Sequence, residues 1–277
     1  MSSAIPFDGG SDARSALDDL AARAAAAVAD RRGSRGVRGW LDRKLREGAI
    51  ELFEREGTPD GVKSQLLADT SRFARLLQLD KYWLWRIGKM IEAARLTRNG
   101  KPVRVLDLGA GSGDLLFAIE KWAQKKRIPV ELSGIDSSEL AVEEARREAG
   151  AEGHRVQFRH GDARALDQIA TGGVDVAVTT FMLHHLPPGD VGRVLAELDR
   201  VAAFDFFAFD LRRNMAAMPA LWAVLRVGGF EAPTRHEQLA SVRRGYTVAE
   251  LHELLRVAGV PRFHVQTLPP AFYDISR

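Results

Sequence analysis

A glycine-rich turn flanked by two acidic residues is the first feature of this sequence that could do chemistry. The turn runs through residues 109–113 (GAGSG), with Asp107 two residues before it and Asp114 directly after it. Glycines allow a tight turn and let backbone N–H groups approach a ligand closely. A dinucleotide-binding turn would have its third glycine at position 114, in the pattern G-x-G-x-x-G. The acidic residues disfavour a pyrophosphate and suit a cationic ligand that carries an ammonium and a sulfonium.

Two further carboxylates follow the next two apolar stretches of the chain. Asp136 ends the segment Gly134-Ile135-Asp136, and Asp162 lies in Gly161-Asp162-Ala163. A carboxylate at the end of a second parallel strand is placed to accept hydrogen bonds from both hydroxyls of a ribose. Asp162 is placed to take the amino group of an adenine. Together with the glycine turn, the two residues predict a nucleoside site.

An adjacent pair of histidines, His184 and His185, lies in the segment 181–187 (FMLHHLP). One histidine could face the substrate as a general base, or the pair could be structural and close the loop by hydrogen bonds. Neighbouring residues of a strand-like segment point in opposite directions, so we expect at most one to face a ligand. No His-x-x-x-His or acidic partner pattern accompanies the pair, and we therefore predict no metal site.

The elements that must position these residues alternate between strand and helix from residue 103 onward. Strands are expected at 103–108, 130–135, 156–159, 174–179 and 204–209, with helices at 115–125, 138–149 and 191–200. This alternation predicts an α/β fold with parallel βαβ units in a doubly wound sheet. Ligands of such sheets bind at the carboxyl ends of the strands, which is where the carboxylates fall.

The two ends of the chain have different patterns. Residues 1–14 are predicted to be a mobile tail, and residues 15–100 a helical N-terminal cap with helices at 15–32, 40–55, 62–79 and 81–96. Trp83 and its aromatic neighbours could pack in the core or form a wall for a flat substrate. Near the C-terminus, Thr247 and Glu250 form a capping-box signature that opens a helix ending at Gly259. Two last strands are expected at 262–267 and 272–276.

Four segments together resemble the class I S-adenosylmethionine-dependent methyltransferases. They are VRVLDLGAGSGDL (103–115), GID (134–136), GDA (161–163) and FMLHHLP (181–187), in that family's order and spacing. The resemblance covers about residues 100–277 and is greatest to small-molecule methyltransferases of the ubiquinone-biosynthesis type. It implies a seven-stranded, Rossmann-like methyltransferase sheet whose last strand is antiparallel, with the cap over the carboxyl ends. The methyltransferase domain would span 101–277, with an insert at about 212–246.

The same resemblance implies S-adenosyl-L-methionine as the cofactor and a set of residues that bind it. These residues are Asp107, Gly109, Ala110, Gly111, Gly113, Asp136, Ser137, Asp162, Ala163, Thr180 and Phe181. The first five would line the methionine part, the next two the ribose and the following two the adenine. The last two would close the site near the transferred methyl group. One departure is the segment 200–203 (RVAA), where many relatives have a Pro-Gly-Gly turn.

The resulting prediction is a methyltransferase that acts on a small organic acceptor. The acceptor would be a phenol, a quinone precursor or a polyketide-like compound, methylated on oxygen or carbon. A non-catalytic S-adenosylmethionine-binding subunit or sensor is the alternative. Glycine spacing disfavours a nicotinamide-dependent oxidoreductase. The basic residues of the insert could capture an acidic substrate or could form surface ion pairs; they are Arg212, Arg213, Arg235, His236, Arg243 and Arg244.

Composition excludes several other classes. The chain has 277 residues and no cysteine, which rules out disulfides, thiolate metal sites and a cysteine nucleophile. Its 40 basic and 37 acidic residues nearly balance, so we expect no nucleic-acid partner. No apolar stretch of about 18 residues is present, and no membrane span is predicted. We expect a cytoplasmic protein that is a monomer or a homodimer.

Overall fold

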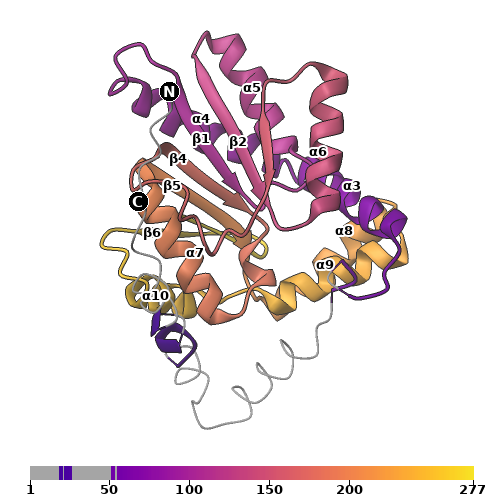
Figure 1. Cartoon of the computed structure of the whole chain (residues 1–277). Coiled ribbons are helices and arrows are strands. Elements are labelled where there is room, and N and C mark those ends of the chain that lie inside the picture. The colour runs from indigo at the N-terminus through magenta and orange to yellow at the C-terminus, as the bar shows by residue number, and fades with distance from the viewer. Residues whose placement is uncertain (1–18, 21, 27–50, 54) are drawn as a thin grey trace.

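The computed structural model describes residues 19–20, 22–26, 51–53 and 55–277 (Figure 1). The expected tail at 1–14 lies outside the described residues, as does most of the helix expected at 40–55. Of that helix, Leu52 and Phe53 form a turn, Glu51 has no regular structure and Arg55 is in a bend, so the helical prediction is wrong at this end. The described members of the helix expected at 15–32 are helical.

A seven-stranded sheet forms the centre of the molecule, with strand order β3-β2-β1-β4-β5-β7-β6. The strands are β1 (Val103–Leu108), β2 (Val130–Asp136), β3 (Gln157–His160), β4 (Val174–Thr180), β5 (Ala202–Leu211), β6 (His264–Leu268) and β7 (Phe272–Ser276). β7 pairs antiparallel with both β5 and β6, whereas β1 to β5 pair in parallel. The predicted doubly wound sheet with an antiparallel last strand is therefore confirmed.

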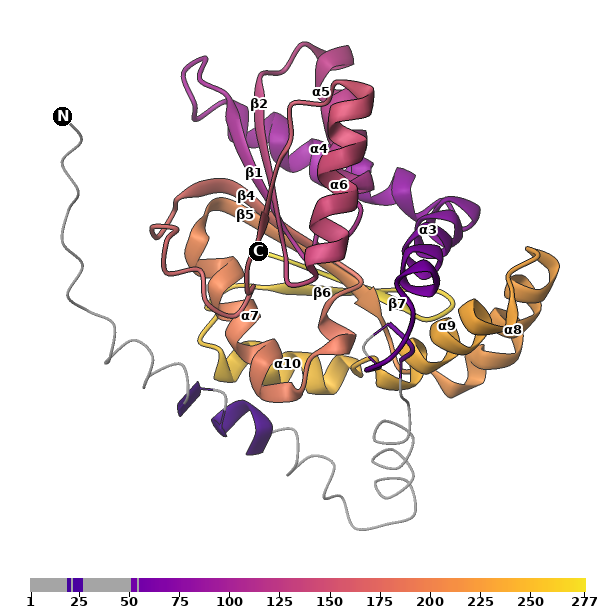
Figure 2. The ribbon, with the colours of Figure 1, turned by 45° about the vertical axis from the view of Figure 1, so that its right-hand side comes forward.

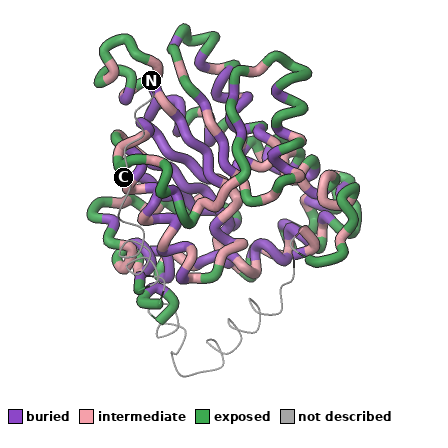
Figure 3. Tube along the Cα trace, viewed as in Figure 1, coloured by how far each residue is buried: buried purple, intermediate pink, exposed green. Residues whose placement is uncertain are grey.

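Helices cover both faces of this sheet and bury its central strands (Figures 1 and 3). They are α3 (Asp60–Leu76), α4 (Leu79–Arg95), α5 (Asp114–Lys126), α6 (Glu139–Glu152), α7 (Pro188–Val201), α8 (Met218–Val227), α9 (Ala232–Arg244) and α10 (Val248–Val257). The core has two parts, one containing Ile87 of α4 and Leu116 of α5, the other Leu195 of α7 and Leu254 of α10. β4 is buried along its first six residues, as expected of a parallel strand covered on both faces.

The two long helices before β1, α3 and α4, occupy different places. α4 lies on a face of the sheet beside α5 and contacts β1, β4 and β5. Its buried residues Trp83, Ile87 and Ile91 recur every four positions, which gives the helix an apolar stripe that matches the sheet. Gly88 lets α4 approach α5, because a Cβ there would lie 2.8 Å from Trp122. α3 lies at the carboxyl ends of the strands, next to α6 and α9 (Figure 2).

Two local predictions can be compared with the structure. The capping box is present: the Thr247 side chain accepts from the Glu250 backbone N–H, and Glu250 accepts from the Thr247 backbone. At 200–203, α7 ends at Val201 and β5 begins at Ala202, so no separate turn fills the place of the Pro-Gly-Gly segment. None of the described helices has the length and the apolar run needed to cross a membrane.

Candidate active site

A cavity of about 700 Å³ opens at the carboxyl ends of β1, β2 and β4. Ten of the eleven residues predicted to bind the cofactor line it, from Asp107 on β1 to Phe181 after β4. Gly113 does not line the cavity. Its φ is 87°, and a Cβ there would lie 2.5 Å from the ring of Phe158, so the position serves a close packing contact behind the turn.

Asp136 fixes the glycine turn as well as facing the cavity. Its Oδ2 accepts from the Gly111 backbone N–H at 2.8 Å, and its Oδ1 accepts from the Ser138 backbone N–H at 2.8 Å. A carboxylate has about four acceptor positions, so both oxygens can take a further hydrogen bond from a ribose hydroxyl. The residue that would hold the ribose thus also ties β2 to the turn after β1.

Asp107 is the most deeply buried carboxyl at the end of the cavity formed by the glycine turn. Its side chain is 1% exposed, and Oδ1 has no hydrogen-bond partner among the described residues. Burial raises the pKa of Asp107 well above its ordinary value, and the nearby Asp136 carboxylate adds to that rise. A buried acceptor without a donor is costly, and the ammonium of a methionine group would supply both the donor and the charge.

Asp162 has a nearer partner than an adenine. The guanidinium of Arg164 donates to both of its oxygens, from Nε to Oδ1 at 2.9 Å and from Nη2 to Oδ2 at 2.7 Å. Hydrogen bonds from Arg164 lower the pKa of Asp162. Arg164 Nη1 also donates to Asp190 of α7 at 2.8 Å. Arg164 therefore joins Asp162 and the loop after β3 to α7 at the rim of the cavity, with Ala163 beside Asp162.

Aromatic side chains close the cavity beyond β4. Phe181 has a φ of 54°, a left-handed conformation that is rare for a side chain of this size. Its ring lies 5.4 Å from that of Trp83 and 5.7 Å from that of Phe209, and its backbone N–H donates to the Phe209 carbonyl. Trp83 is buried and lines the cavity, whereas Trp85 is 53% exposed. Trp83 therefore both packs in the core and forms part of the cavity wall, the two alternatives considered from the sequence.

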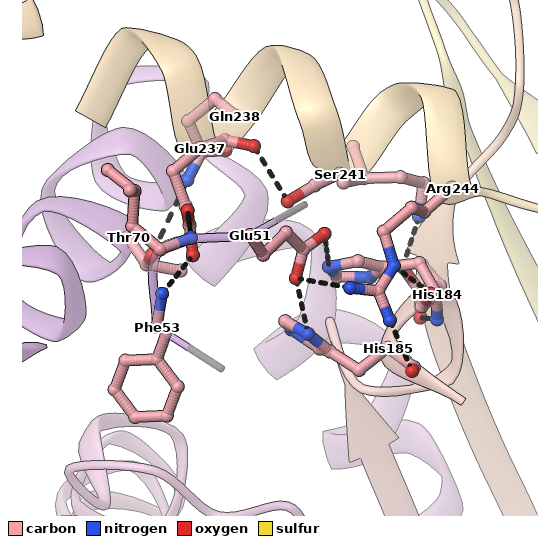
Figure 4. Close-up of polar contacts among 12 residues, drawn as sticks. Glu51, Phe53, Thr70, His184, His185, Glu237, Gln238, Ser241 and Arg244 are labelled. Atoms are coloured by element: carbon pink, nitrogen blue, oxygen red, sulfur yellow. Dashed lines mark hydrogen bonds and ion pairs between the residues drawn. The ribbon is translucent and has the colours of Figure 1, made fainter. Parts of the chain in front are cut away.

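His184 and His185 lie in a one-turn 3₁₀ helix (Leu183–His185) rather than in a strand. The expectation that neighbours point oppositely is wrong for this reason: the ring centroids are 4.1 Å apart, and both residues line the cavity. His184 Nδ1 lies 2.6 Å from Asp210 Oδ1. His185 Nδ1 lies 2.5 Å from Glu51 Oε2 (Figure 4). Each imidazole is therefore paired with a carboxylate.

Glu51 is fully buried beside this pair. Its Oε1 lies 3.8 Å from His184 Nε2, and its Oε2 lies 3.6 Å from Arg244 Nη1. Burial alone would raise the pKa of Glu51, but His185, His184 and Arg244 together hold it well below its ordinary range. Arg244 is fixed in turn, because Nε and Nη2 donate to the carbonyls of His184 and His185 at 3.2 and 2.5 Å.

Ligand atoms of Glu51, His184 and His185 all lie within 4.8 Å of one another, a geometry that could hold a metal ion. The acidic partner that the sequence pattern lacked is therefore present in space. The guanidinium of Arg244 opposes such an ion, since it lies against the same carboxylate and is tied to two carbonyls.

Sequence reasoning missed both carboxylates. Asp210 stands near the carboxyl end of β5, where the rule that singled out Asp107 and Asp136 would have found it. Glu51 has no such signal, because it meets the histidines only through the tertiary fold.

The other end of the cavity is lined from α3 and α9. Gln238 Nε2 donates to Thr70 Oγ1 at 3.4 Å, and the Glu237 carboxylate accepts from the Leu52 and Phe53 backbone N–H groups at 2.6 and 3.2 Å (Figure 4). Burial raises the pKa of Glu237. Leu66, Leu67 and Phe53 add apolar surface. This end suits a small compound with both apolar and polar groups.

The basic residues of the insert are largely used within the protein. Arg213 donates to both oxygens of Glu250 at 2.9 and 2.8 Å, and Arg235 donates to the Phe230 carbonyl at 2.5 Å. Arg244 is held on the histidine carbonyls, and His236 also has a partner within the protein. Their contacts favour the ion-pair interpretation over capture of an acidic substrate.

Comparison with known proteins assigns the fold and the glycine turn to a family. Residues 105–205 match the family model described as "Methyltransferase domain". These residues are a methyltransferase domain, and the relatives described below support a class I S-adenosylmethionine-dependent methyltransferase. S-adenosylmethionine is the cofactor of that family, so the methyltransferase signature in the sequence is confirmed.

Curated proteins similar to this chain include some that are named for quinone biosynthesis. The chain is 34% identical over 130 residues to a "Demethylmenaquinone methyltransferase" of Thermus thermophilus, an alignment that covers 47% of this chain and 54% of the relative. Identity is 26% over 243 residues with a "Ubiquinone/menaquinone biosynthesis C-methyltransferase UbiE" of Bradyrhizobium diazoefficiens, covering 80% and 94%. A "Ubiquinone biosynthesis O-methyltransferase" of Aromatoleum aromaticum is 32% identical over 44% of this chain and 49% of its own length. The chain thus spans about half of the first and last of these relatives.

Among solved structures, the plantazolicin methyltransferase BpumL in complex with SAH has a TM-score of 0.58. The match covers 95% of this chain and 97% of that one at 14% identity. A second structure, the plantazolicin methyltransferase BamL with a triazolic desmethylPZN analog and SAH, has a TM-score of 0.52 over the same shares. At these identities the likeness concerns the fold alone.

Proposed function

We propose that this protein transfers a methyl group from S-adenosylmethionine to a small organic acceptor. The observation that carries the proposal is the continuity of the cavity. It runs from Asp107 and Asp136 at the glycine turn to the histidine pair and to Gln238 of α9. A subunit that merely bound the cofactor would not need the second half of the cavity, which lies at the histidine pair and Gln238.

The residues at the first half fit the cofactor. Asp107 would hold the ammonium, Asp136 with Ser137 the ribose, and Ala163 with the rim residue Asp162 would flank the adenine. Gly109, Ala110 and Gly111 would line the methionine part, while Thr180 and Phe181 would close the site near the methyl group. The bound cofactor supplies an electrophilic methyl on a sulfonium. The protein's part is then to align the acceptor and to exclude water.

At the second half, we propose that one histidine removes a proton from the acceptor. Asp210 holds His184 through Nδ1 and thereby favours the tautomer whose Nε2 carries the lone pair. The acceptor would be a phenol, a quinone precursor or a polyketide-like compound, methylated on oxygen or carbon. Apolar Leu66 and Leu67 would contact its carbon skeleton, and Thr70 and Gln238 its polar groups. Relatives named for ubiquinone and menaquinone biosynthesis support this class.

The test combines binding with turnover. Calorimetry with S-adenosylmethionine and with S-adenosylhomocysteine should give saturable heat for both ligands. Mass spectrometry of candidate phenols, quinone precursors and polyketides should then find a product heavier by one CH₂. No heat with either ligand would sink the proposal. Binding without turnover of any acceptor would favour the non-catalytic subunit.

The ribose contact can be tested separately. Asp136→Asn should weaken S-adenosylhomocysteine binding by about 1–3 kcal/mol. Because Asp136 also holds two backbone N–H groups, an analogue without the ribose hydroxyls is the matched control. The variant should bind that analogue nearly as well as the unaltered protein does. An equal loss with both ligands would leave the loop, and not the ribose, as the cause.

A further inference from the structure

Glu51 is a buried carboxylate whose neighbours belong to the acceptor end of the cavity. It comes from the segment 51–53, far in sequence from the histidine pair, and is 0% exposed. Ionised carboxylates are almost never fully buried unless they are paired, because desolvation is costly. The partners that keep Glu51 ionised are the two imidazoles and Arg244 (Figure 4).

The position of Glu51 is fixed from two sides. Glu237 of α9 accepts from the backbone N–H groups of the next two residues, Leu52 and Phe53. Arg244 lies about two turns further along the same face of α9. It is 3.6 Å from the Glu51 carboxylate and donates to the histidine carbonyls. The same helix therefore anchors the segment that carries Glu51 and the turn that carries His184 and His185.

We propose that Glu51 is a positioning residue for the histidine pair. Its carboxylate orients the His185 ring through Nδ1 and places a negative charge beside both imidazoles. An imidazolium formed when the acceptor loses its proton is stabilised by that charge, as by the carboxylate of a catalytic triad. The role in turnover rests on the proposed function; the role in setting the protonation of the pair does not.

The other charged groups that face the pair define what Glu51 adds. Among the described residues they are Asp210 of β5 and Arg244 and Glu237 of α9. Asp210 is bonded to His184 Nδ1 on the side away from Glu51, while Arg244 contributes a positive charge that Glu51 offsets. Without Glu51, the His185 ring loses the carboxylate on Nδ1 and both imidazoles face an uncompensated guanidinium.

The first experiment needs no acceptor. Histidine ring protons are titrated by NMR in the cofactor-free protein and in Glu51→Gln, with His184→Asn and His185→Asn used to assign two of the seven histidines. The midpoints of both should move to lower pH in Glu51→Gln. In Glu250→Gln, which removes a buried carboxylate paired with Arg213 outside the cavity, they should not move. Unchanged midpoints in a folded Glu51→Gln protein would overturn the proposal.

The second experiment uses turnover once an acceptor is known. Glu51→Gln should lower kcat about 10- to 100-fold and move the acid limb of its pH profile to lower pH, with KM for S-adenosylmethionine unchanged. Glu51→Asp should restore the position of the acid limb, and Glu250→Gln should leave the profile in place. A stoichiometric divalent metal in the purified protein, lost in Glu51→Gln, would instead make Glu51 a ligand and overturn the positioning role.

Discussion

At the scale of a single residue, the buried carboxyl of Asp107 favours a cationic ligand. Burial raises the pKa of this carboxyl, and Asp136 raises it further, so the ionised form is disfavoured until a cation arrives. An ammonium in the site favours the ionised form, so binding releases a proton. We therefore predict that S-adenosylhomocysteine binds more tightly as pH rises through the pKa of Asp107. Calorimetry in two buffers of different ionisation enthalpy measures the released proton.

Asp107→Asn provides the control for that prediction. The variant should lose both the proton release and the pH dependence below about pH 7, where the ligand's amino group stays protonated. The raised pKa of Asp107 also makes the stability of the fold depend on pH. A carboxyl whose pKa is raised on folding stabilises the fold fully below its unfolded pKa, and this contribution is lost as pH rises through the folded pKa. A proton release that persists in Asp107→Asn would assign it to another group.

At the scale of the element, Gly113 lies where β1 passes into α5. Gly113 and Gly153 both have left-handed backbone, with φ of 87° and 72°. A Cβ at Gly113 would lie 2.5 Å from Phe158, whereas none of the described atoms lies within 4 Å at Gly153. Gly113→Ala should lower the free energy of unfolding by about 2–4 kcal/mol and Gly153→Ala by about 1 kcal/mol. Urea unfolding measures both, and equal losses would show that the Phe158 contact relaxes.

The same scale explains how far the sequence predicts the fold. The prediction placed β1 and β7 to the residue, and each begins within two residues of a proline. The prediction failed where contacts between distant parts of the chain determine how a segment is placed. α4 packs its apolar stripe on the sheet, and Gly88 lets it approach Trp122 of α5. His184 and His185 face the same way because their segment is a 3₁₀ turn.

At the site, the carboxylates on β1 and β2 were predictable because parallel strands bring their carboxyl ends together. Arg164, the partner of Asp162, is only two residues away in sequence, a spacing from which this ion pair could have been predicted. Glu51 and Arg244 could not be inferred, because nothing in their local sequence indicates that the fold brings them to the histidines. The sequence therefore predicts the part of the cavity at the glycine turn better than the part at the histidine pair.

At the scale of the whole molecule, α3 connects the two halves of the cavity. Ser71 of α3 donates to Asp114 beside the glycine turn at 2.7 Å. One residue before it, Thr70 accepts from Gln238 of α9, and Asp69 accepts from Thr234 of α9 at 2.5 Å. Cofactor binding at the turn should therefore order α3 and, through it, the helix that anchors Glu51 and the histidine turn.

We predict that S-adenosylhomocysteine slows amide hydrogen exchange in α3 and α9 as well as in the glycine turn. At about 100 times Kd the ligand stabilises the whole fold by about 2.7 kcal/mol, which slows exchange by global unfolding everywhere. α10 and β6 lie away from the cavity and report that global part. Any slowing of exchange in α9 that exceeds the slowing in α10 and β6 measures the connection through α3. In Ser71→Ala the excess in α9 should shrink while protection of the glycine turn remains, and an excess in α9 that survives the substitution would place the connection elsewhere.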